Sequence, residues 1–332
     1  MSLVEKWPAA LRRRWALRRL AGDLQHADPA IRLAAAGTLG EMGDPRGTAP
    51  LIAALVDPVQ TVRLAAGQAL ARIGPLAVEP LVAALQEPGW RMRQATALAL
   101  GQAIALQEDS ALRTKAVQAL VAALDDEEGR VRVAAVQALG GIGAQHHQDD
   151  AQALVEKALL GALEDESWAM RQAAGEALAG LGMPAVEPLI ASTQHGRWPV
   201  RQGAARALGV LAAHLADEAA LEQAVGALVV TLRDGEAQVR LAAAKALGQT
   251  AEQLAATGWR GRVLRALVPA LEDRQTLVRE AAAHALGQLG DARAVESLLV
   301  AAEDESEGVR LAAAKALDRL ARAQGIQVSV RR

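Results

Sequence analysis

Small and aliphatic residues recur along the whole chain at helical spacing. An arginine-centred phrase, such as VRLAAGQALARIG at 62–74 or VRLAAAKALGQTA at 239–251, occurs nine times. Counted from its arginine, small residues fall mainly at +2, +3 and +6, leucine at +7 and usually an aliphatic residue at +10. This spacing predicts a helix with a thin, alanine-rich buried stripe. The nine arginines are Arg32, Arg63, Arg93, Arg132, Arg171, Arg201, Arg240, Arg279 and Arg310.

A second apolar segment precedes each phrase, as in AVEPLVAAL at 77–85 and AVESLLVAA at 294–302. Each unit is therefore predicted to be a helix A, a turn and a helix B. One such pair cannot bury its own apolar face, but stacked pairs can, and stacking builds a solenoid. We expect helix B to line the inner surface of that solenoid.

Two unit lengths are mixed, because successive repeat arginines lie either 30–31 or 39 residues apart. The longer units carry extra residues between helix B and the next helix A, at about 101–113, 141–152, 209–222 and 248–262. We expect all four insertions on one edge of the solenoid. They are either binding loops or simply longer helices.

Acidic residues and glycines mark the predicted helix ends. Carboxylates just ahead of helix B are expected to cap its free amides; they are Asp57, Glu87, Asp126, Glu166, Asp234, Asp273 and Asp304. Glycines are expected to end helix B in the left-handed conformation; they are Gly43, Gly74, Gly143, Gly182 and Gly290. The repeat arginines and the acids ahead of them should form a charged ladder between repeats.

The phrases VRxxAAxALGxIG and AVEPLIxAL resemble the HEAT-like repeats of phycobilisome bilin lyases. The resemblance covers residues 28–322 and implies an all-α fold, an α-solenoid in the form of a right-handed superhelix of about nine HEAT-like helix pairs. Residues 1–27 would form the first helix and N-terminal cap, and residues 323–332 a C-terminal tail. Repeats of this family mostly supply scaffolds, so the resemblance predicts fold more specifically than activity.

Composition narrows the classes of function. Hydrophobic residues make up 52% of the chain but aromatics only 2%, with neither Phe nor Tyr, which disfavours a sheet sandwich and an aromatic-lined pocket. The absence of cysteine excludes disulfides and thiol chemistry. Net charge is −2, yet residues 1–26 carry six cations and two anions. We see no signal peptide or apolar run long enough for a membrane span, and expect a cytoplasmic protein.

The exposed face of helix B offers candidate binding residues. Position +5 becomes cationic in the C-terminal half, at Arg206, Lys245, His284 and Lys315. Position +1 is rich in leucine and glutamine. Such a surface suits a partner protein or an extended acidic peptide, although simple solvation of the cations is the competing interpretation.

Tryptophan is the only aromatic residue, and its placement is regular. Trp90, Trp168 and Trp198 each lie three residues before a repeat arginine, where they would either anchor a partner or fill the turn. Trp259, in an insertion, looks exposed. Another insertion contains His146 and His147 near two aspartates, but neighbouring histidines in a polar loop are usually solvated, so we predict no metal site.

We predict a non-enzymatic protein-interaction scaffold without a cofactor. Bilin-lyase-like chromophore handling is one alternative. Nucleic-acid binding through the first helix, with Arg12, Arg13, Arg14, Arg18 and Arg19, is another, which the overall charge disfavours. Among HEAT-like enzymes, deoxyhypusine hydroxylase holds iron with His-Glu pairs, and no His here is followed by Glu. A glycosylase-like site would need Trp168 or Trp198 with Glu166 in a basic groove.

Overall fold

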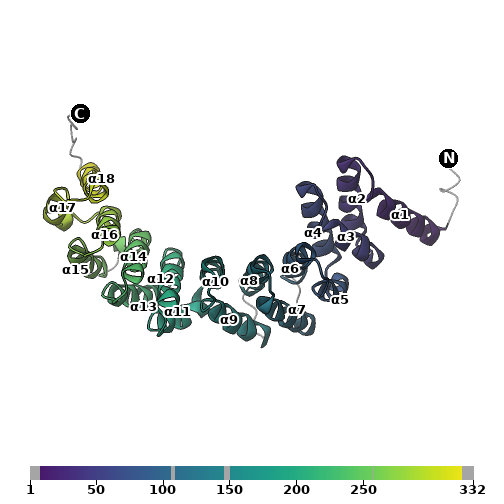
Figure 1. Ribbon diagram of the computed structural model, residues 1–332, viewed down its shortest axis with the longest axis horizontal. Helices are drawn as coiled ribbons and strands as arrows, with labels where there is room; N and C mark the ends of the chain where they lie inside the picture. Colours follow the sequence, from purple (N-terminus) through teal and green to yellow (C-terminus); the bar gives the residue numbers. More distant parts are fainter. Residues whose placement is uncertain (1–7, 106–108, 146–149, 257, 324–332) are drawn as a thin grey trace. The chain divides into compact units, whose positions relative to one another are not determined.

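Helices arranged in consecutive pairs make up the structure. The computed structural model describes residues 8–105, 109–145, 150–256 and 258–323. Across these ranges it forms nine helix pairs and no strand, which confirms the all-α solenoid (Figure 1). Helices A are α1 Ala9–Asp23, α3 Thr48–Ala54, α5 Pro75–Ala84, α7 Ser110–Ala122, α9 Asp150–Ala162, α11 Val186–Ser192, α13 Glu218–Thr231, α15 Arg260–Ala270 and α17 Val295–Ala301. Helices B are α2 Pro29–Met42, α4 Gln60–Ile73, α6 Trp90–Ile104, α8 Gly129–Gly143, α10 Trp168–Gly180, α12 Trp198–Ala212, α14 Ala237–Gln249, α16 Thr276–Leu289 and α18 Glu307–Ala323.

The chain divides into two compact units. Unit 1 comprises residues 1–162 and 167–177, and unit 2 comprises residues 163–166 and 178–332, so the boundary falls inside α10. Within unit 1, α2, α4, α6 and α8 pack in succession as one layer against the helices A, and α12, α14, α16 and α18 do the same in unit 2 (Figure 1). The placement of helices B on an inner surface, and the handedness of a superhelix, stay predictions.

The core of each unit follows the predicted stripe. The leucine at +7 is fully buried in these helices B except α18, where Leu317 is half-buried; examples are Leu70, Leu100, Leu247 and Leu286. Alanines at +3 and +6 are buried beside it, as at Ala66 and Ala69. The small side chains keep the two helical layers close, because little volume separates them.

Neighbouring helices B approach most closely where a glycine at +8 meets an alanine at +6 of the next repeat. A Cβ built on Gly101 would lie 2.7 Å from the Cβ of Ala138 and 2.9 Å from its Cα. Gly209 stands in the same relation to Ala246, at 2.5 and 2.7 Å. Real Cβ atoms do not approach so closely, so the glycine in the recurring ALG sequence sets the spacing of these helices.

The left-handed helix ends are confirmed at Gly43 and Gly290, which follow α2 and α16 with φ of 56° and 68° and ψ of 24°. Gly74 and Gly182 also have positive φ, but their ψ of −129° and −139° lies outside the left-handed helical region, so the prediction is wrong there in detail. The prediction for Gly143 is wrong, because this glycine is the last residue of α8 and the helical conformation continues into Ala144.

The capping role predicted for the acids is also wrong in detail. Asp57 accepts a bond from the backbone N–H of Val59, which is itself the N-cap residue of α4, and Asp126 bonds Glu128 in the same way. The carboxylate therefore stabilises the turn two residues ahead of the helix rather than the first helical turn.

Longer helices account for much of the extra length of the 39-residue units. Helix A has 7–10 residues in α3, α5, α11 and α17, but 11–14 residues in α7, α9, α13 and α15. The longer-helix interpretation is thus the better one over the described parts of the insertions. His146 and His147 lie outside the described residues.

Candidate binding groove

A ladder of ion pairs joins successive repeats. Arg93 donates from Nε and Nη2 to the two carboxylate oxygens of Asp126, at 2.6 and 2.9 Å, and from Nη1 to two backbone carbonyls of its own turn. Both side chains are only 11% exposed. The bonds from Arg93 hold the pKa of Asp126 below its ordinary value, against the opposing effect of burial. The same fork joins Arg32 to Asp57, Arg201 to Asp234, Arg240 to Asp273 and Arg279 to Asp304. The predicted ladder is confirmed.

The ladder is interrupted between α4 and α6, both in unit 1. Arg63 makes the usual two bonds from Nη1, to the carbonyl oxygens of Asp57 at 2.8 Å and Pro58 at 3.1 Å. The position that elsewhere supplies the aspartate is occupied by Glu87, whose side chain is exposed. Among the described residues, Nε and Nη2 of Arg63 have no hydrogen-bond partner.

The same junction lacks the close glycine contact. Position +8 of α4 is Ala71, and position +6 of α6 is the buried Ala99. Since even a bare Cβ at Gly101 or Gly209 would collide with the next helix, α4 cannot approach α6 as closely as those helices approach their neighbours. Two departures from the repeat pattern therefore coincide at one junction.

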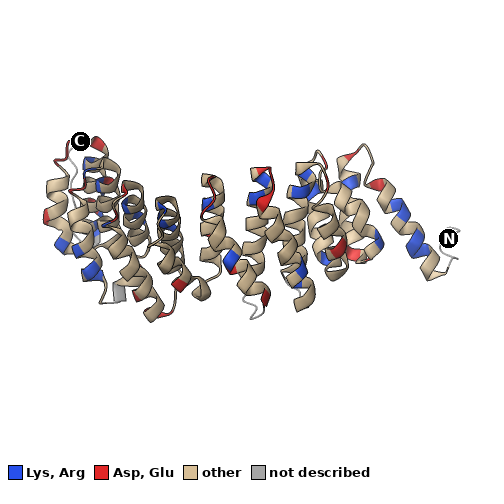
Figure 2. Ribbon diagram, turned by 60° about the horizontal axis from the view of Figure 1, so that its bottom comes forward, with Lys and Arg blue, Asp and Glu red and all other residues tan. Residues whose placement is uncertain are grey.

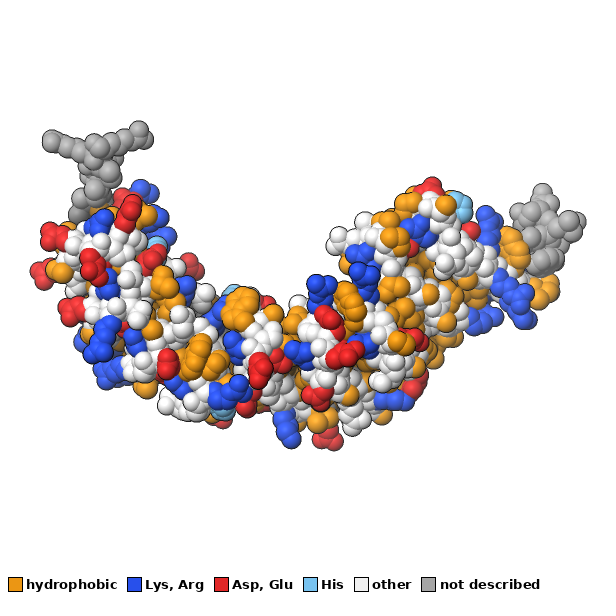
Figure 3. Space-filling view, viewed as in Figure 1, with side chains coloured by type: hydrophobic (Ala, Val, Ile, Leu, Met, Phe, Trp, Pro, Cys, Tyr) orange, Lys and Arg blue, Asp and Glu red, His pale blue; other side chains and the backbone are white. Residues whose placement is uncertain are grey.

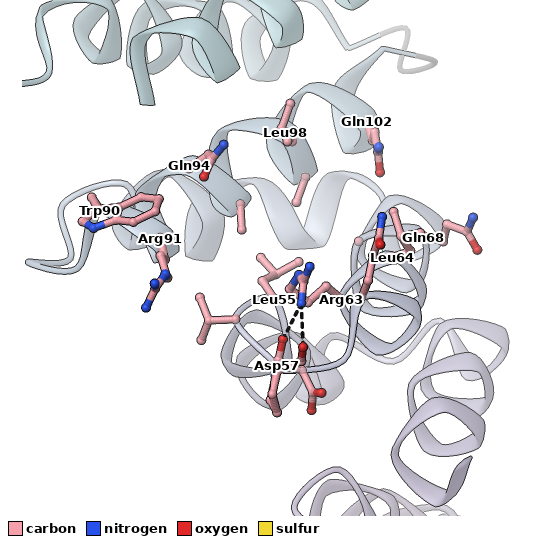
Figure 4. Close-up of a pocket in the computed structure, with 16 residues that line it drawn as sticks. Leu55, Asp57, Arg63, Leu64, Gln68, Trp90, Arg91, Gln94, Leu98 and Gln102 are labelled. Carbon is pink, nitrogen blue, oxygen red and sulfur yellow. Dashed lines mark hydrogen bonds between the residues drawn. The ribbon is translucent and has the colours of Figure 1, made fainter. Parts of the chain in front are cut away.

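A groove of about 710 Å³ opens there. Gln94, Leu98 and Gln102 of α6 and Leu64 and Gln68 of α4 line it; Figure 4 shows Gln102 pointing toward α4 and Arg63 beside the turn that contains Asp57. Gly67 makes room at one end, because the Gln102 amide oxygen lies 3.4 Å from where its Cβ would be. The groove thus combines exposed leucine, a set of amides and an arginine fork.

Trp90 forms one end of the groove. It is the first residue of α6 and half-buried. The guanidinium carbons of Arg91 and Arg130 both lie 5.0 Å from its ring centre, Arg130 coming from the next helix B. These cation–π contacts fix the ring as part of the groove wall.

The other tryptophans predicted as anchors differ in exposure. Trp168 and Trp198 each begin a helix B and are 57% and 39% exposed. They belong to different units, so their predicted position on one shared edge stays a prediction. The expectation that Trp259 is exposed is wrong. Its ring lies 3.2 Å from the Cβ position of Gly226, and Arg262 lies over it at 4.6 Å.

The predicted cationic row is present on unit 2. Arg206, Lys245, His284 and Lys315 are exposed on α12, α14, α16 and α18, which pack in succession. Figure 2 shows basic residues recurring on these helices, and Figure 3 shows acidic, basic and hydrophobic side chains mixed on the face in view. Whether this row binds a partner stays a prediction.

On α1, Arg13 has a structural role. It bonds Asp44 at 2.9 Å and the carbonyl of Met42, the last residue of α2. Arg260 likewise bonds the carbonyl of Leu289 at the end of α16. The other four α1 arginines are exposed.

Comparisons with known proteins define the family. A model described as HEAT repeats matches residues 9–71, 48–114, 78–160 and 264–328, and a model described as a HEAT-like repeat matches residues 198–250. The first model alone matches more than half of the chain, so the protein belongs to the HEAT-repeat family. The finer resemblance to phycobilisome lyase repeats is not confirmed, and neither model indicates an enzymatic family.

Several solved structures of karyopherins have the same fold. Kap121p aligns with a TM-score of 0.64 and 17% identity, over 93% of this chain and 38% of its own. Kap121p bound to the extreme C-terminus of the protein phosphatase Cdc14p gives 0.65 and 16%, over 92% and 38%. Kap95p, in a structure with RanGDP, gives 0.60 and 17%, over 95% and 46%. The chain thus spans less than half the length of these structures, and at this identity the likeness shows the fold alone.

No curated protein matches the sequence. In the part of the chain that the structure describes, no helix is long and apolar enough to cross a membrane, and no group of three or more His, Asp or Glu side chains is arranged to hold a metal ion.

The sequence carried the signals for the groove, but they were missed. Ala71 replaces the glycine of the ALG phrase, and Glu87 replaces the aspartate. Each looks conservative when its own repeat is considered alone. That both lie at the junction of α4 and α6 becomes visible only when residues of adjacent repeats are compared in pairs.

Proposed function

We propose that this protein is a non-enzymatic interaction scaffold that holds an extended segment of a partner protein against its helices B. The observation that carries the proposal is the α4–α6 groove, where leucine and glutamine side chains are left exposed beside Trp90 and Arg63. Tryptophan and arginine are the side chains most enriched among residues that dominate binding energy at protein interfaces.

The groove suits an extended backbone. Gln68, Gln94 and Gln102 each carry both donors and an acceptor, and can bond the N–H and C=O groups of a segment that has no strand partner of its own. Leu64, which is 56% exposed, and Leu98 offer apolar contact for its side chains. The groove therefore recognises the extended backbone of a bound segment as well as its side chains.

The lining suits binding better than catalysis. The one carboxylate that lines the groove, Asp57, accepts two bonds from Arg32, which hold its pKa low and leave it a poor general base. The other side chains of the lining are amides, guanidinium groups, the Trp90 indole and hydrocarbon. Kap121p bound to Nup53p and to the Cdc14p C-terminus offers the precedent for partner binding by this fold.

Capture of partners from the native host tests the proposal. Leu64→Arg places a charge in the groove, and Leu311→Arg is the matched control, since Leu311 has the same repeat position and is 53% exposed on α18. Mass spectrometry should find partners crosslinked to the native protein and to Leu311→Arg that are depleted with Leu64→Arg. Identical partner sets for all three proteins would reject the groove as the binding site.

Two further functions stay predictions. Chromophore handling of the bilin-lyase type is tested by the absorbance spectrum of protein purified from its own host. Nucleic-acid binding is supported by the four exposed arginines of α1 and is tested by the salt dependence of binding to duplex DNA. A cytoplasmic location likewise stays a prediction.

A further inference from the structure

We infer that the groove recognises an acidic residue, and that the aspartate or glutamate of a partner peptide binds Nε and Nη2 of Arg63. The partner would supply in trans the carboxylate that the next repeat supplies at the intact rungs, which are the Arg–Asp ion pairs of the ladder. This inference rests on the proposed function, because it names the chemistry of the segment that the groove holds.

The intact rungs show what Arg63 is built to bind. In each of the five, Nε and Nη2 form one edge of the guanidinium and donate to two oxygens of one aspartate, at 2.6–3.0 Å. A planar fork of this kind matches the two oxygens of a carboxylate, and it matches no neutral side chain equally well. At Arg63 the same edge borders the groove without an acceptor among the described residues.

The fork is held in place before any ligand arrives. Nη1 of Arg63 is bonded to the carbonyls of Asp57 and Pro58, as Nη1 of Arg93 is bonded to those of Glu87 and Pro88. The side chain therefore has little freedom to lose on binding, and a preorganised donor gains affinity for that reason.

The surrounding charges favour an anion. Arg91 also lines the groove and lies over the Trp90 ring. The Asp57 carboxylate is neutralised by its fork with Arg32. Glu87 is exposed and is not part of the lining. The charge left uncompensated inside the groove is therefore positive.

An extended peptide fits the groove better than a free anion does. A small anion would satisfy Arg63 but leave Leu64, Leu98 and the glutamine side chains of the groove in contact with water. A peptide that places one acid on Arg63 also covers the exposed leucines and fills a volume of about 710 Å³. We therefore expect one fixed acidic position within a short apolar and polar sequence.

Selection from a random 12-residue peptide library on the full chain tests the inference. Enriched peptides should share an aspartate or glutamate at one position. Its replacement by asparagine or glutamine in the synthetic peptide should weaken binding at least about tenfold, as expected for loss of a charge-assisted pair. Failure to enrich any peptide would count against both the groove function and the acidic specificity.

Variants of the protein separate the outcomes. Arg63→Gln should weaken binding of the selected peptide by a similar factor. The variant should also bind the acidic peptide and its amide counterpart equally well. Arg310→Gln is the matched control, because Arg310 makes the same two bonds, to the carbonyls of Asp304 and Glu305, and lies in unit 2. It should bind the peptide normally with a comparable change in thermal stability. Arg63→Lys, which keeps the charge but not the fork, should recover only part of the affinity.

Peptides that bind in a manner sensitive to Leu64→Arg but show no acidic preference would overturn this inference and leave the scaffold function standing. Acidic peptides that bind Arg63→Gln as tightly as the native protein would place the acid elsewhere. If the enriched peptides match a segment of this chain's own sequence, the partner is a second copy of the protein.

Discussion

Replacing Gly101 with alanine tests whether the glycine at +8 sets the spacing of helices B. The new Cβ would lie 2.7 Å from the Ala138 Cβ, whereas carbon atoms pack at about 3.5–4.0 Å, so α6 and α8 must separate by roughly 0.8 Å or more. Overpacking of this kind costs about 1–3 kcal/mol. Gly141→Ala on α8 is the control, because nothing lies within 4 Å of its Cβ position.

Both substitutions gain about 1 kcal/mol of helix propensity, which cancels when the two variants are compared. The Gly101→Ala protein should therefore be less stable than the Gly141→Ala protein by about 1–3 kcal/mol. Urea and thermal unfolding followed by circular dichroism measure the difference. Adding Ala138→Gly should recover part of the loss, since it removes the colliding methyl group. Equal stability of the two single variants would refute the spacing argument.

Three further outcomes are expected. Because the pKa of Asp126 is lowered in the folded protein, its ion pair with Arg93 contributes its full stability above the pKa of an unfolded aspartate, about 3.9, and that stability is lost as pH falls through the folded pKa. The difference in melting temperature between the native protein and Asp126→Asn should therefore shrink in acid. A difference that stays constant with pH would contradict this. Trp259→Ala should lower stability more than Trp198→Ala, by about 2 kcal/mol in unfolding experiments, because only Trp259 packs on Gly226; the reverse order would be wrong for this packing. Duplex DNA should bind weakly, with no change when the four exposed α1 arginines become glutamine; tight, salt-sensitive binding would favour the nucleic-acid alternative.

The fold could be predicted from the sequence because each repeat states the same pattern again. Leu70 or Leu247 alone would be one apolar residue, but its recurrence at +7 identifies the buried face of every helix B. The ladder was predictable for the same reason. What the pattern did not give is the end of α8, where Gly143 stays helical because the unit is long and its helix B continues.

The candidate site was harder to predict because it depends on what differs between repeats. The cationic row was found from its positions, and its exposure is as expected. Trp259 was misjudged because its neighbours in sequence are polar or small, whereas Gly226, on which its half-buried ring packs, lies on the preceding helix A. The groove depends on the spacing that Ala71 sets between α4 and the next repeat, which periodicity within one repeat does not describe.

Restoring the repeat pattern at the interrupted junction tests this explanation of the groove. Ala71→Gly removes the methyl group that keeps α4 from approaching α6, and Ala99 already provides the partner alanine. Glu87→Asp supplies a carboxylate at the position that bonds the preceding arginine elsewhere. We expect the double variant to form a new rung with Arg63.

A new rung would have two measurable signatures. The selected peptide should lose at least about tenfold in affinity, because its acceptor site is now occupied within the chain. Thermal stability at neutral pH should also acquire an added component that disappears in acid, since the new aspartate would have a lowered pKa as Asp126 has. Glu87→Gln with Ala71→Gly is the control, because it provides the glycine without the carboxylate and should show no acid-sensitive component. If the aspartate double variant kept the native peptide affinity and the native pH profile, an interrupted ladder would not be the origin of the groove, and Arg63 would have to be explained by some other constraint on α4.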